Sequence, residues 1–325
     1  MRRREFTALL GSAAIAWPLT SGAQQPAEMP VMGFLDSSAG TATKITAFYG
    51  GLKIEGFVRN QNVAVEYHSA EGDYGRLPGL AADLVNRRVA VIASIGTPAA
   101  LAAKAATAKI PIIFAVESNP VQSGLISSLN RPGGNITGVA NMAEDQTQKR
   151  LELLQELIPA ASALALLINS TNPNAETQTQ DALTAARKMG LQVNVIQASA
   201  ESDFATAFAR LADLRASGLA ISDDALFMSR SAELAALAVR RAVPAVFNHR
   251  EFVAAGGLMS YGSDLTETYH QAGVYSGLIL KGGETADLPV YQSTKVEFRV
   301  NLRTAKLLGL SFPLSLLGRS NEVIQ

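Results

Sequence analysis

The segment VAVIASIGTPAALAAKAAT, residues 89–107, contains the unit from which the whole chain is built. Residues 89–95 form a short, mostly apolar run, as expected for a buried strand, and a helix is expected from Pro98 to about Thr107. Thr97 can cap this helix, and Pro98 suits its first position, where no N–H is needed. Gly96 leaves the backbone open to a neighbouring group. The segment therefore predicts a strand that passes directly into a helix.

The same alternation runs through most of the sequence and occurs in two sets. Strands alternating with helices indicate parallel sheets covered on both faces, and two sets indicate two doubly wound lobes. We therefore predict an α/β protein with two lobes. The first set has expected strands at 31–35, 63–67, 89–95 and 110–116, with helices near 42–57, 77–85 and 98–107. The second has strands at 163–168, 191–196, 218–222 and 243–247, with helices near 145–158, 175–189, 202–216 and 229–241.

Residues 129–138, LNRPGGNITG, separate the two sets and contain proline and paired glycine. Such a segment is either an ordinary surface loop or a crossing between lobes. Further segments follow the second set: an expected strand at 257–261, a helix at 265–281 and a strand at 296–302. Their presence suggests that the chain returns to the first lobe and then to the second. We assign residues 30–138 plus 256–284 to lobe 1, and residues 139–255 plus 285–325 to lobe 2.

The first 23 residues have the order of an export signal. Arg2 to Arg4 are followed by an apolar stretch, Leu9 to Leu19, and then by small residues that favour cleavage after Ala23. The stretch is about half the roughly 20 residues of a membrane-spanning helix. The pair Arg3-Arg4 resembles a twin-arginine signal, and a general secretory route is the alternative. Either route predicts a periplasmic protein.

Composition excludes several classes of function. Removal of residues 1–23 takes away three of the 28 basic and one of the 28 acidic side chains, leaving a net charge of −2. This balance gives no electrostatic basis for binding nucleic acid. The chain has no cysteine, and its three histidines are too far apart in sequence for a local metal motif. Nucleophile-elbow, dinucleotide and phosphate-loop motifs are also missing. We expect no catalysis, cofactor or metal.

Polar residues recur directly after the expected strands. In open parallel sheets ligands bind outside the carboxyl ends of the strands, so these residues predict a polar cleft between the lobes. At Gly96 and Thr97, free N–H groups and the helix dipole suit an anionic group. The aromatic candidates for stacking against a ligand could equally be core residues. The candidate ligand-binding residues are Asp36, Tyr74, Gly96, Thr97, Asn119, Asn172, Asp223, Phe227, Asn248 and Tyr261.

Several segments together resemble one family, the ABC transporter substrate-binding proteins of the tryptophan- and tyrosine-uptake type. The resemblance covers essentially the whole chain. It is carried by residues 95–107, 131–138, 251–262, 286–290, 301–306 and 321–324.

This resemblance implies the type I periplasmic-binding-protein fold, with two Rossmann-like lobes, a three-crossing hinge and a ligand closed between them. It implies an ABC permease as partner and no catalysis; we also expect a monomer. The Gly96-Thr97 turn matches the family and would hold a ligand carboxylate. The resemblance implies an aspartate where this chain has Asn119, which would pair less strongly with an α-ammonium group. Glu117 or Asp223 would then supply the missing charge.

Two alternatives remain open from the sequence. A sensor subunit of the same fold would dock on a signalling receptor instead of a permease. An exported enzyme would use scattered acids such as Asp223 and Glu251. Turnover of a bound compound would favour the enzyme.

Overall fold

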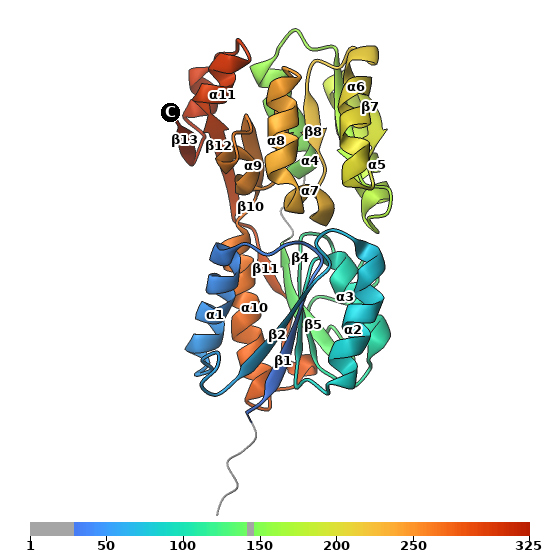
Figure 1. The fold of residues 1–325 in the computed structure, drawn as a ribbon, viewed down its shortest axis with the longest axis vertical. Helices are drawn as coiled ribbons and strands as arrows, with labels where there is room; N and C mark the ends of the chain where they lie inside the picture. Colours follow the sequence, from blue (N-terminus) through green and yellow to red (C-terminus); the bar gives the residue numbers. More distant parts are fainter. Residues whose placement is uncertain (1–28, 142–145) are drawn as a thin grey trace, which may run out of the picture.

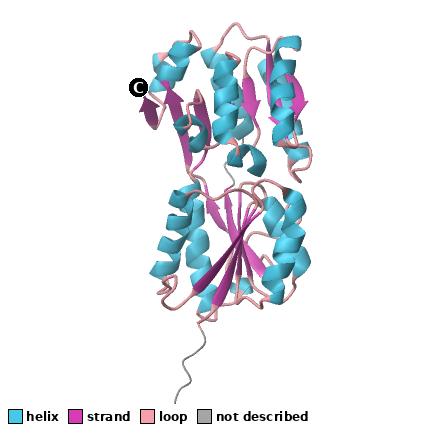
Figure 2. Ribbon diagram, in the orientation of Figure 1, coloured by secondary structure: helices cyan, strands magenta, loops and turns pink. Residues whose placement is uncertain are grey.

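The computed structural model describes residues 29–141 and 146–325 and shows two α/β lobes, one above the other in Figure 1. Each lobe is a sheet with helices on both faces (Figure 2). This confirms the predicted fold class. The predicted export signal, residues 1–23, lies outside the described residues. Among those that are described, no helix is long and apolar enough to cross a bilayer.

The sheet of lobe 1 has six parallel strands in the order β11-β5-β4-β3-β1-β2. One face carries α1 and α10, the other α2 and α3, and each interface has its own apolar core. The strands are β1 (Val31–Asp36), β2 (Ala64–Ser69), β3 (Ile92–Ile95), β4 (Ile112–Val116), β5 (Ile136–Asn141) and β11 (Tyr291–Ser293). The helices are α1 (Ala42–Ile54), α2 (Leu77–Asn86), α3 (Thr97–Ala106) and α10 (Leu265–Leu280), with the short turns η1 (Tyr74–Arg76) and η3 (Thr285–Asp287).

The sheet of lobe 2 has seven strands in the order β13-β12-β10-β9-β8-β6-β7, and β10 and β12 pair antiparallel. α4, α5 and α12 cover one apolar core, and α6, α7, α8 and α9 cover the other. The strands are β6 (Ala163–Ile168), β7 (Gln192–Gln197), β8 (Leu219–Ile221), β9 (Ala245–Phe247), β10 (Met259–Ser263), β12 (Val296–Asn301) and β13 (Glu322–Ile324). The helices are α4 (Gln146–Leu157), α5 (Ala175–Met189), η2 (Glu201–Asp203), α6 (Phe204–Asp213), α7 (Ala225–Ser229), α8 (Ser231–Arg240), α9 (Arg250–Ala254), α11 (Leu302–Leu307) and α12 (Leu314–Leu317).

The sheet topology corrects the lobe boundaries drawn from sequence. β10, which falls in the 256–284 segment assigned to lobe 1, pairs with β9 and β12 in the second sheet. β11, in the 285–325 segment assigned to lobe 2, pairs with β5 in the first. The 129–138 segment is not a crossing, because Ile136 already begins β5. The chain crosses between the lobes after β5, after β10 and after β11, which gives the three crossings of the predicted hinge.

Helix α10 returns to lobe 1 because it fits closely against α1; the two lie side by side in Figure 1. A Cβ on Gly51 would lie 1.9 Å from the backbone oxygen of His270, and one on Gly273 would lie 2.1 Å from that of Phe48. Only glycine permits this approach. The contact ties the segment that follows the second crossing to the first lobe.

Smaller differences concern short elements. The helix expected at 229–241 is α8, and a separate short helix that was not predicted, α7, precedes it and ends at Ser229. The short elements α9, α11, α12, β11 and β13 were not predicted, because segments of three to six residues carry too little periodicity.

Candidate functional site

The carboxyl ends of the parallel strands in both sheets face each other across a cleft with two joined cavities. A central cavity of about 60 Å³ lies between the ends of β1, β3 and β4 in lobe 1 and the loop after β8 in lobe 2. A wide, more open cavity of about 510 Å³ lies beside it, against α4 and α5. Glu117, Asn174 and Asp223 line both. The two cavities therefore form one binding cleft.

The start of α3 forms one wall of the central cavity. Gly96 has φ 86°, and a Cβ there would lie 2.8 Å from the Ser37 Oγ, so this position requires glycine. Ser37 Oγ accepts from the backbone N–H of Ala99 at 3.0 Å. The Thr97 hydroxyl lies 2.8 Å from the Ser118 Oγ and accepts from the Asn174 side chain of lobe 2 at 3.2 Å. The predicted anion pocket therefore lies at the contact between the lobes.

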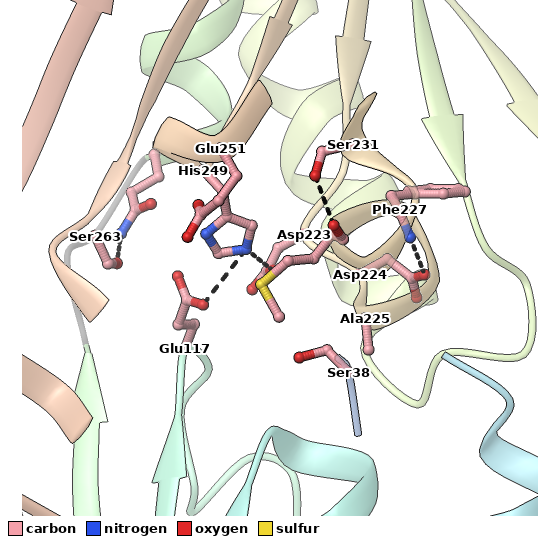
Figure 3. A network of polar contacts seen from close by, with 12 residues as sticks. Ser38, Glu117, Asp223, Asp224, Ala225, Phe227, Ser231, His249, Glu251 and Ser263 are labelled. Atoms are coloured by element: carbon pink, nitrogen blue, oxygen red, sulfur yellow. Dashed lines mark hydrogen bonds and ion pairs between the residues drawn. The ribbon is translucent and has the colours of Figure 1, made fainter. Parts of the chain in front are cut away.

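Two carboxylates and an imidazole meet where the two cavities join (Figure 3). His249 Nε2 lies 3.4 Å from Asp223 Oδ1 and 3.8 Å from Glu117 Oε1. Glu117 follows β4 of lobe 1, whereas Asp223 and His249 follow β8 and β9 of lobe 2. Their ligand atoms all lie within 4.8 Å of one another, a spacing that could hold a cation, whether a metal ion or an ammonium group. No local sequence motif marks this group, because its three members come from separate segments of the chain.

Burial and neighbouring charges give the two carboxyl groups different pKa values. Burial, together with the charge of Asp223, raises the pKa of Glu117 to about 7. Burial also acts to raise the pKa of Asp223, but the hydrogen bond and charge of His249 outweigh it and hold that pKa below its usual range. Near neutral pH Asp223 is therefore ionised, whereas Glu117 changes charge. An incoming cation would complete the ionisation of the pair.

Arg150 supplies a buried positive charge in the wall of the wide cavity. Its side chain is 3% exposed; it donates to the backbone oxygen of Tyr261 at 3.3 Å and to Thr147 Oγ1 at 3.0 Å. Its Nε has no hydrogen-bond partner, and no carboxylate of the described chain forms an ion pair with it. A buried guanidinium with spare donor capacity can bind a carboxylate or carbonyl oxygen.

Direct contacts hold the two lobes together at the other side of the cleft. The Tyr74 hydroxyl of lobe 1 donates to Asp224 Oδ2 at 2.6 Å and accepts from the Ala225 backbone N–H at 3.1 Å. Lys44 of α1, 4% exposed, forms an ion pair with Glu251 of α9 at 2.9 Å. These contacts indicate a closed arrangement of the lobes.

Most of the sequence-predicted residues line this cleft. Asp224, next to the predicted Asp223, points the other way: it caps α7 and accepts from Tyr74, so the pair is more than a polar loop. Burial raises the pKa of Asp36 to about 6. The central cavity is lined by Asp36, Tyr74, Gly96, Thr97, Asn172 and Asp223, and the wide cavity by Asn119 and Asp223.

Three predicted residues lie elsewhere. Phe227 is fully buried in the lobe 2 core, 5.9 Å from the ring of Phe204, and so cannot stack on a ligand. Tyr261 packs against Phe298, with ring centroids 6.3 Å apart. Asn248 is 2% exposed and lies behind the cleft, outside the lining of both cavities as described. The expectation of an aromatic wall from Phe227 is therefore wrong, whereas that from Tyr261 stays a prediction.

Sequence reasoning missed Arg150 and Asn174. Arg150 falls on an amphipathic helix, where a charged residue is usually solvent-exposed. Asn174 stands in a polar loop, and only its contact with Thr97 of the other lobe distinguishes it. The Asn119 Oδ1 accepts from the N–H groups of Val121 and Gln122 and so shapes its own loop.

Comparison with known proteins finds a match that includes both lobes. The family model described as ABC transporter substrate binding protein matches residues 29–324. The chain belongs to this family. A tyrosine-binding protein from Clostridioides difficile (strain R20291) is 27% identical over 263 residues, 81% of this substrate-binding protein and 75% of the relative.

Two solved structures resemble this chain over 91% of its length. An ABC domain from Streptococcus pneumonia in complex with L-Trp has TM-score 0.81 at 24% identity and covers 91% of this chain and 99% of its own. A ligand-free, open substrate binding protein with adhesive properties from Clostridium difficile has TM-score 0.63 at 25% identity with the same coverage. Both show the same two-lobed fold as this substrate-binding protein.

Proposed function

We propose that this protein captures an amino-acid-like solute between its lobes outside the cytoplasmic membrane and delivers it unaltered to an ABC permease. Residues 1–23 would direct export and be removed after Ala23. The protein would act as a monomer, because the two lobes of one chain complete the cleft.

One observation carries the proposal: the carboxylates of Glu117 and Asp223 approach each other from opposite lobes at the junction of the two cavities. An α-ammonium group placed there would pair with both and so stabilise the closed form over the open form. A ligand shifts such an equilibrium only through its preference for one state. Contacts made by both lobes provide that preference.

The α-carboxylate has a suitable place in the central cavity, beside Gly96 and Thr97 at the start of α3. Helix N-termini favour anions through their dipole, and the Thr97 hydroxyl can donate here, whereas the Ala99 N–H is already bonded to Ser37 Oγ. The ammonium and carboxylate positions are thus adjacent, as an α-amino acid requires. The tyrosine and L-Trp named for the relatives support an amino acid as ligand.

Binding of an unaltered solute can be tested directly by isothermal titration calorimetry with single L-amino acids. We expect at least one to bind, and to be recovered unchanged by mass spectrometry. The Glu117→Gln and Asp223→Asn variants should each weaken its binding by tenfold or more, on the order of 1.5–3 kcal/mol for a hydrogen bond to a charged group. Glu156→Gln at the other end of α4, outside the lining of both cavities as described, is the matched control and should bind normally.

Failure of all amino acids to bind the purified protein, or chemical conversion of the bound compound, would refute the proposal. Delivery to a permease is tested separately, by uptake of the identified amino acid in cells with and without the gene.

A further inference from the structure

We infer that the wide cavity recognises an uncharged side chain rich in hydrogen-bonding groups, so that the solute is a carboxamide or ureido amino acid such as glutamine or citrulline. This inference rests on the proposed function and names the class of solute. It differs from the aromatic ligands named for the relatives.

The first argument is size. The central cavity, at about 60 Å³, is much smaller than the wide cavity, at about 510 Å³. The smaller cavity suits the α-carboxylate, and the larger one has the room for a side chain. Since Glu117 and Asp223 at the junction hold the ammonium group, the side chain has to extend into the wide cavity.

The second argument is the chemistry of the wide cavity. Apart from Pro173 and Ala185, every side chain that lines it in the described chain is polar or charged, and none is aromatic or branched aliphatic. An aromatic ring there would bury polar groups without hydrogen bonds, which costs free energy. The uncharged polar lining residues are Ser118, Asn119, Gln122, Ser123, Asn141, Gln146, Thr147, Gln148, Asn174, Thr177, Gln178 and Thr184.

The aromatic residues near the cleft do not change this result. Two tyrosines line the central cavity, Tyr74 and Tyr269. The Tyr74 hydroxyl bridges the lobes, and Tyr269 is 1% exposed with its hydroxyl 3.4 Å from Asp36 Oδ2. Neither lines the wide cavity, where the side chain would lie.

The third argument is charge. Once Glu117 and Asp223 hold the ammonium group, the wide cavity retains two cations, Arg150 and Lys188, and one anion, Asp181. A basic side chain would face two like charges there, whereas an amide can accept from the guanidinium through its oxygen and donate through its nitrogen. A carboxamide or ureido group can accept and donate in this way.

The test is calorimetric titration of the full protein, freed of bound solute, with seven L-amino acids: glutamine, asparagine, citrulline, glutamate, lysine, tyrosine and tryptophan. We expect the tightest binding from one of the first three, at least about tenfold tighter than tyrosine or tryptophan. Tighter binding of an aromatic, acidic or basic amino acid would overturn the inference and leave the proposed function intact. If none of the seven binds, the inference fails, and the proposed function fails only if the remaining amino acids do not bind either.

A variant pair locates the subsite. Gln178 lines the wide cavity and donates to the Asp223 backbone oxygen at 2.9 Å, whereas Gln180 on the same helix donates to Glu176 on the outer face. Gln178→Met keeps the length of the side chain and should weaken binding of the preferred amide by about fivefold, the loss of one hydrogen bond. Gln180→Met should bind normally. Equal affinity of the two variants would overturn the inference.

Discussion

Closure of the lobes can be tested with a single methyl group at Gly72. This glycine of lobe 1 has φ +89°, and a Cβ on it would lie 2.5 Å from the Cα of Leu226 in lobe 2 and 2.9 Å from its backbone nitrogen. Both atoms are backbone and cannot rotate away. The Gly72→Ala variant should therefore keep the lobes from closing completely.

The expected effect follows from the distances. An ordinary contact begins at 3.4 Å, so the lobes have to stay about 1 Å further apart at this point. The 2.6 Å bond from Tyr74 to Asp224 and the 2.9 Å bond from the Ala39 N–H to Ser229 would then be stretched beyond hydrogen-bonding length. Loss of two or three such bonds, at about 1 kcal/mol each, predicts roughly 30- to 150-fold weaker solute binding.

Gly56→Ala is the matched control. Gly56 also lies in lobe 1 and has φ +83°, but nothing lies within 4 Å of its Cβ position. Both variants place alanine in the left-handed region, which costs about 1–2 kcal/mol of conformational free energy. This cost is the same in the open and closed forms. Calorimetry should show weak binding only for Gly72→Ala. Small-angle scattering should show that the radius of gyration of this variant does not decrease when solute is added. Equal affinities would refute the reasoning.

Three further predictions follow from the contacts between the lobes. Tyr74→Phe should weaken solute binding about tenfold in calorimetry, because it removes hydrogen bonds made only in the closed form. Tyr67→Phe is the control and should leave binding unchanged, because the Tyr67 hydroxyl contacts only lobe 1. Lys44→Met should also weaken binding by about tenfold, because Glu251 loses its cation only in the closed form, and unchanged affinity would contradict this role. Solute affinity should rise from pH 6 to pH 8 as Glu117 ionises through its pKa of about 7, whereas Glu117→Gln should give a flat profile. Because this pKa lies above the unfolded value of 4.5, the solute-free wild type should lose stability as pH rises from 4.5 to 7, and thermal melts of wild type and Glu117→Gln should converge at low pH.

The fold was largely predictable because its evidence is local. Each long strand and helix shows its own periodicity, as in α5, whose ends match the expected 175–189 and whose Gly190 adopts the left-handed conformation of a C-terminal stop. The lobe assignment of β10 and β11 was not predictable in this way. Both are short, and their membership depends on pairing with strands far away in sequence.

The site was predictable in outline only. Residues after strand ends, such as Thr97 and Asp223, could be placed at the cleft from the parallel-sheet rule alone. Phe227 could not be assigned, since a phenylalanine near a strand end suits a core as well as a ligand wall. The role of Asp224 depends on Tyr74 of the other lobe, and no local pattern encodes how two lobes meet.

A crystal structure of the protein with L-glutamine tests the central claim most directly. The account predicts closed lobes, with the solute nitrogen in hydrogen-bonding contact with both Glu117 and Asp223 and the side-chain amide in the cavity between α4 and α5. Solute bound on the outer surface of one lobe, or lobes that remain apart with glutamine present at saturating concentration, would contradict it.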